Sequence, residues 1–218
     1  AHAMYFKVKP MIDFVGAAVG LMVASPLMAA IAVAVKLDSR GPVLYKQQRM
    51  GRDGQPFMIY KFRSMVDNAE KSTGAVWATR NDPRVTRVGR ILRNYHLDEL
   101  PQLINILWGH MAFVGPRPLY VSQIAEWNAR QRIRLLVKPG LTGLAQVSGR
   151  GELTVEEKLE LDVRYVEQAG LRLDSRILLA TVLRVFARRG IYEKRYSRAE
   201  DTRRPSGSGP NVDSSKRE

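Results

Sequence analysis

Two adjacent carboxylates, Asp98 and Glu99, are the residues of this 218-residue chain whose types most directly suggest chemistry. A carboxylate is ionised at neutral pH, so it can attack a phosphorus atom without a base, and its hard oxygen atoms suit Mg²⁺. Apolar residues recur with helical spacing from 100 to 108, so we expect the pair to begin a helix that stops at Gly109. Capping of that helix is the alternative role for the pair, because Asp is a preferred N-cap and Glu suits the positive end of the helix dipole.

Three further segments have residue types that could bind phosphate. Segment 114–118 (VGPRP) holds Arg117 between two prolines, and the planar guanidinium matches phosphate oxygens. Segment 138–150 (KPGLTGLAQVSGR) contains three glycines, which would let the backbone approach a ligand, although it has neither Walker A nor GxGxxG spacing. The alternatives are a rigid turn with a solvated arginine for the first segment, and a hairpin whose glycines serve turns for the second.

The third segment, 60–65 (YKFRSM), places Lys61 and Arg63 on one face of a predicted strand, with a solvated edge as its alternative. This strand belongs to a predicted β-hairpin over 43–65, whose two apolar stretches flank the turn-rich residues 51–54. A loop follows over 66–86, and then a short basic helix over 88–94.

The longest apolar stretch, residues 14–35, contains 22 residues without a charge. A straight helix of that length crosses a bilayer, at about 1.5 Å per residue. Ser25-Pro26 lies near its midpoint, where proline removes a backbone donor and predicts a kink. A single crossing and a helical hairpin both fit, because basic residues flank the stretch on both sides and give no orientation.

The C-terminal part is predicted to be helical and then irregular. Residues 154–168 carry mixed charges, and residues 175–189 form a basic amphipathic helix, which suits either a membrane interface or packing on the core. From 197 to 218 no apolar periodicity remains, so we expect a disordered tail.

The composition indicates that the binding partners are anionic, but it does not show which anionic partner the chain binds. Lys and Arg number 35 against 21 Asp and Glu, and the net charge of +14 attracts nucleic acid, anionic membranes or phosphorylated substrates. The chain has no Cys, which excludes disulfides, zinc–thiolate sites and Cys nucleophiles. The opening Ala1-His2-Ala3 is typical of residues left by cloning, so His96 and His110 are too few for a histidine-based metal site.

Taken together and in this order, these motifs resemble the bacterial sugar transferase family, the monotopic phosphoglycosyl transferases that initiate glycoconjugate assembly on a polyprenyl phosphate. The resemblance covers about residues 11–191. It rests on Ser25-Pro26, on YKFRSM at 60–65 and LRNYHLDELPQLINIL at 92–107, and on FVGPRP at 113–118 and KPGLTGLAQVSGR at 138–150.

The resemblance implies a mixed α/β fold, with a small sheet and several helices, on the cytoplasmic face of the bacterial inner membrane. Residues 1–10 would be the cloning remnant and lead-in, 11–37 a re-entrant membrane hairpin broken at Ser25-Pro26, 38–196 the catalytic domain and 197–218 the tail. Interfacial amphipathic helices would help to embed the domain. Because the chain starts at the hairpin, it looks like the minimal form of the family.

The implied reaction moves a phosphosugar from a UDP-sugar to a polyprenyl (undecaprenyl) phosphate and releases UMP. Asp98 would form a covalent aspartyl-phosphosugar, and Glu99 would help to hold Mg²⁺ or handle protons. The residues expected to bind phosphate or nucleotide are Lys61, Arg93, Arg117, Arg150 and Asp162.

The expected partners are therefore the UDP-sugar, the polyprenyl phosphate and membrane lipid, without nucleic acid. Homo-oligomerisation stays open, as do the sugar and the lipid length. The rival interpretations are a nucleic-acid-binding protein, for which the sequence has no recognisable motif, and an inactive single-pass membrane adaptor.

Overall fold

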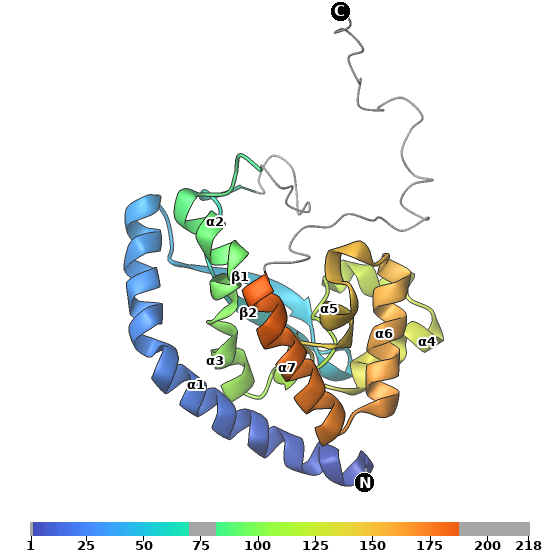
Figure 1. Cartoon of the computed structure of the whole chain (residues 1–218). Coiled ribbons are helices and arrows are strands. Elements are labelled where there is room, and N and C mark those ends of the chain that lie inside the picture. Colours follow the sequence, from blue (N-terminus) through green and yellow to red (C-terminus); the bar gives the residue numbers. More distant parts are fainter. Residues whose placement is uncertain (1, 70–81, 188–218) are drawn as a thin grey trace, which may run out of the picture.

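The computed structural model describes residues 2–69 and 82–187, which form a helix-rich domain with two small sheets and a long N-terminal helix (Figure 1). The predicted tail at 197–218 and most of the predicted loop at 66–86 lie outside the described residues. Helix α1 (His2–Asp38) bends around one side of the domain. The helices that follow are α2 (Arg87–Asn94), α3 (Gln102–Leu107), α4 (Ala129–Arg132), α5 (Leu144–Ser148), α6 (Val155–Gln168) and α7 (Leu171–Ala187).

The first sheet is the predicted β-hairpin. Strands β1 (Leu44–Met50) and β2 (Pro56–Phe62) pair antiparallel, and the short 3₁₀ turn η1 (Arg52–Gly54) joins them. In this turn Asp53 and Gly54 have positive φ angles of 54° and 73°, a conformation that Gly adopts freely and Asp more readily than most residues.

The second sheet corrects the hairpin alternative for segment 138–150. Strand β4 (Gly140–Thr142) pairs in parallel with β3 (Ala112–Val114), so its partner comes from an earlier part of the chain. The glycines permit close backbone approach here, because a Cβ on Gly140 would lie 2.1 Å from the backbone nitrogen of Gly115. The sheet therefore holds segment 114–118 against the glycine-rich segment.

Helix α1 contributes to three separate apolar clusters along its length. Tyr5 and Phe6 pack with α6 and α7, Ala17 packs with α3 and β2, and Ile31 and Val35 pack with α2 and the end of β2. The other side of α1 exposes large apolar side chains: Met4, Val8, Met11, Ile12, Phe14, Val15, Val19, Met22, Val23, Leu27, Val33 and Leu37. Within residues 2–69 and 82–187, it is the one helix long and apolar enough to cross a membrane by length and composition.

The expected interruption of the helix at Ser25-Pro26 is not seen, since α1 is continuous through both residues. Pro26 cannot donate to the carbonyl oxygen of Met22, four residues earlier. The hydroxyl of Ser25 donates to this oxygen instead, at 2.9 Å. Residues 11–37 thus belong to one bent helix and not to two helices, and the relation of α1 to a membrane is taken up below.

Three of the remaining helical predictions are confirmed, with shifted boundaries. The predicted helices at 88–94, 154–168 and 175–189 correspond to α2, α6 and α7, although α7 begins four residues earlier and residues 188–189 are not described. Thr86 caps α2 and Thr154 caps α6. Helix α7 buries Ile177 in the core and exposes Leu178, Leu179, Val182 and Leu183, so core packing accounts for only one of its faces.

Candidate active site

The carboxylate pair lies in a tight turn between α2 and α3. His96 lies two residues after the end of α2 in the left-handed conformation, with φ 58°, and is the N-cap of the 3₁₀ turn η2 (Leu97–Glu99). The N-cap of α3 is Pro101, and no side chain caps this helix. Neither Asp98 nor Glu99 therefore caps α3 through a side-chain hydrogen bond.

Glu99 is held by two cations from distant parts of the sequence. Its Oε1 accepts a hydrogen bond from Lys61 Nζ at 2.7 Å and another from Arg117 Nη2 at 2.9 Å. The Glu99 side chain is only 12% exposed, whereas that of Arg117 is 38% exposed. The site is thus closed around Glu99 and open on the side of Arg117.

Asp98 is buried beside this group. Burial raises the pKa of Asp98 above its ordinary value of 3.8, and the neighbouring charge of Glu99 adds to this, while Lys61, Arg93 and Arg117 act in the opposite direction. Within residues 2–69 and 82–187, no group donates a hydrogen bond to the Asp98 carboxylate. The carboxylate is therefore surrounded by positive charge without being fixed by it.

The register of β2 places Lys61 opposite Glu99, and Asn105 on α3 sets that register. Asn105 Oδ1 accepts from the Tyr60 amide at 3.1 Å, and its Nδ2 donates to the Met58 carbonyl at 2.7 Å. Asn105 is fully buried, so these bonds join α3 to β2 away from water. Sequence reasoning missed this residue; its one signal is a polar side chain inside an apolar helix.

The two other basic residues near the predicted strand differ in role. Arg93, in the last turn of α2, donates through Nε to Ser64 Oγ at 2.8 Å and is close enough to Asp98 to lower its pKa. Arg63 lies beyond the end of β2 and is buried, and its Nη2 donates to the carbonyl of Ser39 at 2.7 Å. Arg63 therefore caps the C-terminal end of α1 and does not join Lys61 in the site.

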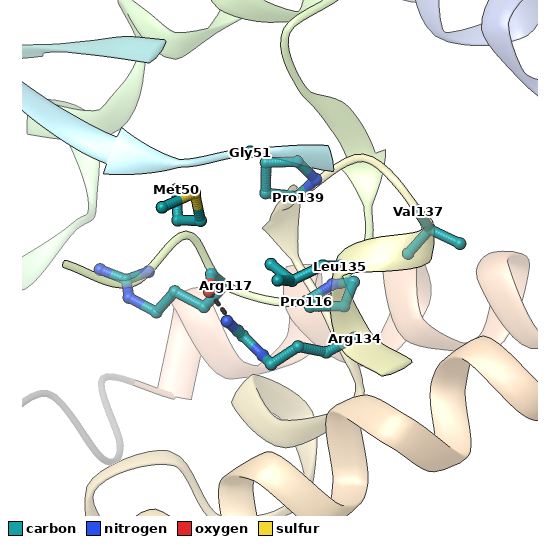
Figure 2. A pocket seen from close by; sticks show the side chains of 8 residues that line it. All are labelled: Met50, Gly51, Pro116, Arg117, Arg134, Leu135, Val137 and Pro139. Atoms are coloured by element: carbon teal, nitrogen blue, oxygen red, sulfur yellow. Dashed lines mark hydrogen bonds between the residues drawn. The ribbon is translucent and has the colours of Figure 1, made fainter. Parts of the chain in front are cut away.

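Asp162 lies behind the site rather than in it. It is buried on α6, and its Oδ2 accepts from Arg134 Nη2 at 2.8 Å and from Nε at 3.1 Å. Arg134, in turn, contacts the backbone of Arg117 next to a small surface pocket (Figure 2). The backbone of Arg150 is described in η5 (Arg150–Glu152), but its side chain lies outside the described part, so its predicted role stays a prediction.

The donor set fits Mg²⁺ only together with a ligand. No three His, Cys, Asp or Glu side chains of the described residues converge on one point. Mg²⁺ is commonly bound by one or two carboxylates together with substrate phosphates and water. Asp98 and Glu99 fit that arrangement, and the surrounding Lys61, Arg93 and Arg117 suit the phosphate charges.

The chain is similar in sequence to one protein family and to several of its members. The sequence model of the bacterial sugar transferase family matches residues 4–188. A UDP-glucose:undecaprenyl-phosphate glucose-1-phosphate transferase of Klebsiella pneumoniae is 42% identical over 190 residues, which are 83% of this chain and 40% of the relative. The uncharacterized sugar transferase EpsL of Bacillus subtilis is 38% identical over 201 residues, covering 92% of this chain and 96% of EpsL.

A UDP-N-acetylgalactosamine-undecaprenyl-phosphate N-acetylgalactosaminephosphotransferase of Aeromonas hydrophila is 40% identical over 185 residues, which are 82% of this chain and 44% of the relative. The chain spans about 40% of the length of the glucose-1-phosphate transferases that it matches. Because the family model covers residues 4–188, it includes the carboxylate pair and nearly all of helix α1. The chain belongs to the bacterial sugar transferase family.

Proposed function

We propose that this protein transfers a sugar phosphate from a UDP-sugar to undecaprenyl phosphate at a membrane surface, and so carries out the first membrane step of bacterial glycoconjugate assembly. The observation that carries the proposal is the buried Asp98 beside Glu99, which Lys61 and Arg117 hold at 2.7 and 2.9 Å. The printed names of the relatives from Klebsiella pneumoniae and Aeromonas hydrophila describe transfers of this class.

In the first step, an oxygen of Asp98 attacks the β-phosphorus of the donor. The bond from that phosphorus to the bridging oxygen breaks, UMP leaves, and a covalent aspartyl-phosphosugar remains. Lys61, Arg93 and Arg117 would neutralise the phosphate charge, which is the main requirement of phosphoryl transfer. Asp98 needs no base, because a carboxylate is a competent nucleophile once ionised.

In the second step, a phosphate oxygen of the lipid attacks the same phosphorus atom, and Asp98 is released. The product is an undecaprenyl diphosphate sugar. Bound Mg²⁺ would supply charge neutralisation for the diphosphate, with Asp98 and Glu99 as its protein ligands. A covalent intermediate lets a water-soluble donor and a lipid acceptor use one site in turn.

The covalent step is tested by mixing the enzyme with a UDP-sugar and Mg²⁺ in the absence of lipid acceptor. The expected result is a burst of UMP about equal to the amount of enzyme, together with a phosphosugar adduct on the peptide that contains Asp98. Turnover with undecaprenyl phosphate but without burst or adduct would mean direct transfer between the two substrates. Screening UDP-sugars for UMP release identifies the donor.

We also propose that α1 is re-entrant, entering and leaving the membrane on the cytoplasmic face. Both of its ends are bonded to the same domain: Lys9 Nζ lies 2.6 Å from Asp174 Oδ2 on α7, and Asp38 Oδ2 accepts from the Val88 amide at 2.9 Å. A helix that crossed a bilayer would place its ends about 30 Å apart on opposite sides and could not keep both contacts. The exposed Leu178, Leu179, Val182 and Leu183 of α7 would rest at the interface.

This topology is tested by labelling single cysteines, because the chain has none of its own. Lys7→Cys and Arg40→Cys place one thiol at an exposed position near each end of α1. A membrane-impermeant maleimide should label both in inside-out vesicles and neither in intact spheroplasts. Labelling of the two positions from opposite sides would instead support the single-pass interpretation.

A further inference from the structure

Arg134 is a buried arginine that joins the active site to helix α6. It lies in the 3₁₀ turn η4 (Ile133–Leu136), its side chain is 2% exposed, and its guanidinium carbon lies 4.8 Å from the ring centre of Trp127. Two of its nitrogens bond Asp162 Oδ2, and Nη2 also donates to the carbonyl oxygen of Arg117 at 2.5 Å (Figure 2). The guanidinium is thus fixed on three sides.

The contact between Arg134 and the Arg117 carbonyl is important because the side chain of Arg117 reaches Glu99. The Arg117 guanidinium donates to Glu99, so its carbonyl oxygen and its side chain connect Arg134 to the carboxylate pair. Pro116 and Pro118 flank this residue and have no backbone N–H with which to fix the segment. Figure 2 shows Arg134 reaching the segment beside the pocket that Met50 and Pro139 also line. On either side of Arg117 the backbone is held by the Gly140 amide, which donates to Pro116 O at 2.9 Å, and by the Met50 amide, which donates to Leu119 O at 3.0 Å, so Arg134 supplies the bond at Arg117 itself.

Stability alone gives a poor account of this buried ion pair. Asp162 places both hydrogen bonds on Oδ2, while its buried Oδ1 has no hydrogen-bond partner within residues 2–69 and 82–187. An unsatisfied buried oxygen is destabilising, and buried ion pairs are often no more stable than apolar pairs of similar volume. The position in which the Arg134–Asp162 pair holds the Arg117 backbone explains the pair better than its contribution to stability does.

We propose that Arg134 and Asp162 are positioning residues, which hold the Arg117 backbone so that its guanidinium meets Glu99 and the donor phosphate. Asp162 then acts through Arg134 and Arg117, and does not touch phosphate itself. The rate measurement that tests this proposal rests on the proposed function. The hydrogen-exchange measurement depends on the structure alone.

The test replaces the pair by apolar residues, in the double variant Arg134→Met/Asp162→Leu. Its thermal unfolding midpoint should equal or exceed that of the wild type, whereas kcat for UMP release should fall about 100-fold, as expected when a charged group moves by about 1 Å. Glu160→Gln is the matched control: it breaks an exposed pair with Arg130, two residues before Asp162 on the same helix, and should leave the rate unchanged. A wild-type rate in the folded double variant would overturn the proposal.

A double-mutant cycle separates positioning from direct contact. In an Arg117→Ala background the double variant should lower the rate by no more than about twofold, since the residue through which it acts is already gone. A further 100-fold loss in that background would show that Asp162 or Arg134 acts on the substrate directly, which contradicts the proposal. If the apolar pair does not fold, Arg134→Lys takes its place in the cycle, because one ammonium cannot reproduce the three hydrogen bonds of the fork.

Amide hydrogen exchange gives the readout that needs no activity. Exchange over 115–120 should rise in the double variant while exchange in α6 stays protected. Unchanged exchange over 115–120 contradicts the positioning proposal whatever the enzyme does. Absence of UMP release from the wild type contradicts the proposed function, and leaves this exchange comparison to decide on Arg134.

Discussion

Two buried aspartates of this molecule, Asp98 and Asp174, are bonded in opposite ways. Asp174 is 4% exposed, and both of its oxygens are occupied: Oδ2 accepts from Lys9 at 2.6 Å and from Tyr5, and Oδ1 accepts from Tyr165 at 2.9 Å. Asp98 is 9% exposed, and within the described ranges it has three cations nearby but accepts no hydrogen bond.

The difference indicates what each carboxylate can do. A carboxylate with both oxygens bonded holds elements together, and Asp174 joins α1, α6 and α7. A carboxylate that is buried without such bonds is costly to the fold, and its lone pairs remain available to an electrophile. Burial alone does not separate the two roles; the hydrogen bonds do.

The largest effect is expected from a substitution at Asp98. Asp98→Asn should lower the rate of UMP release by about 10⁴-fold or more, because the nucleophile is lost. The thermal unfolding midpoint should stay equal or rise, because burial has raised the pKa of Asp98 and the uncharged amide removes that cost at neutral pH. Enzyme assay and thermal unfolding in the same detergent measure both, and an unfolded variant would contradict this account of Asp98.

Asp174→Asn should give the reverse pattern. Removing one partner of a buried ion pair leaves Lys9 with only the longer contact to Asp13, at 3.7 Å, so the free energy of unfolding should fall by up to about 3–5 kcal/mol, while the activity per folded molecule changes little. Denaturation in detergent with a matched activity assay makes the measurement, and Glu160→Gln, at an exposed ion pair, is the control for a carboxylate that contributes little. A stable but inactive variant would place Asp174 in the chemistry.

Arg117→Lys should lower kcat by about 10-fold to 100-fold at nearly unchanged stability. An ammonium keeps the charge, but it does not reproduce the planar fork that can bond Glu99 and phosphate together. Steady-state kinetics with Arg130→Lys as the control, at an exposed arginine, isolates the effect of position. Equal rates in the two variants would show that only charge is needed at residue 117.

The smallest expected effect is a shift in pH dependence. Because burial raises the pKa of Asp98, its carboxylate should take up a proton at a higher pH than an exposed aspartate, so the burst rate should fall as the pH is lowered through a midpoint above 3.8. Lys61 lowers that pKa, so Lys61→Met should move the midpoint to higher pH. A midpoint that stays in place in the variant would assign the titration to another group.

Local patterns predicted much of the fold. Alternating and helical periodicities located the hairpin around 51–54 and the helices α2, α6 and α7, because each depends on neighbours within a few residues. The spacing after Asp98 also indicated the helix that stops at Gly109, whose φ of 77° fits the expected glycine at this point. The pairing of Glu99 with Lys61 and Arg117 was not visible in spacing, and only the resemblance indicated that these segments share a site.

The missed features all depend on contacts between distant residues. Asn105 bonds β2 from 45 and 47 residues away, and Arg134 meets Asp162 across 28 residues. Arg63 was grouped with Lys61 because both alternate along a strand, but β2 ends between them, at Phe62. Periodicity reports which face a residue occupies, and it contains no information about which partner the fold brings to that face.

The bond between Lys9 and Asp174 also has a consequence for biosynthesis. Its two residues are 165 positions apart, so at about 5–20 residues per second a ribosome reaches Asp174 on the order of 10–30 s after Lys9. During this interval the apolar face of α1 is already complete, while the charged partner that fixes its first turns does not yet exist. If the N-terminal helix enters lipid during this interval, it does so before it is attached to the domain, and the contact with Lys9 can form only after Asp174 has been synthesised.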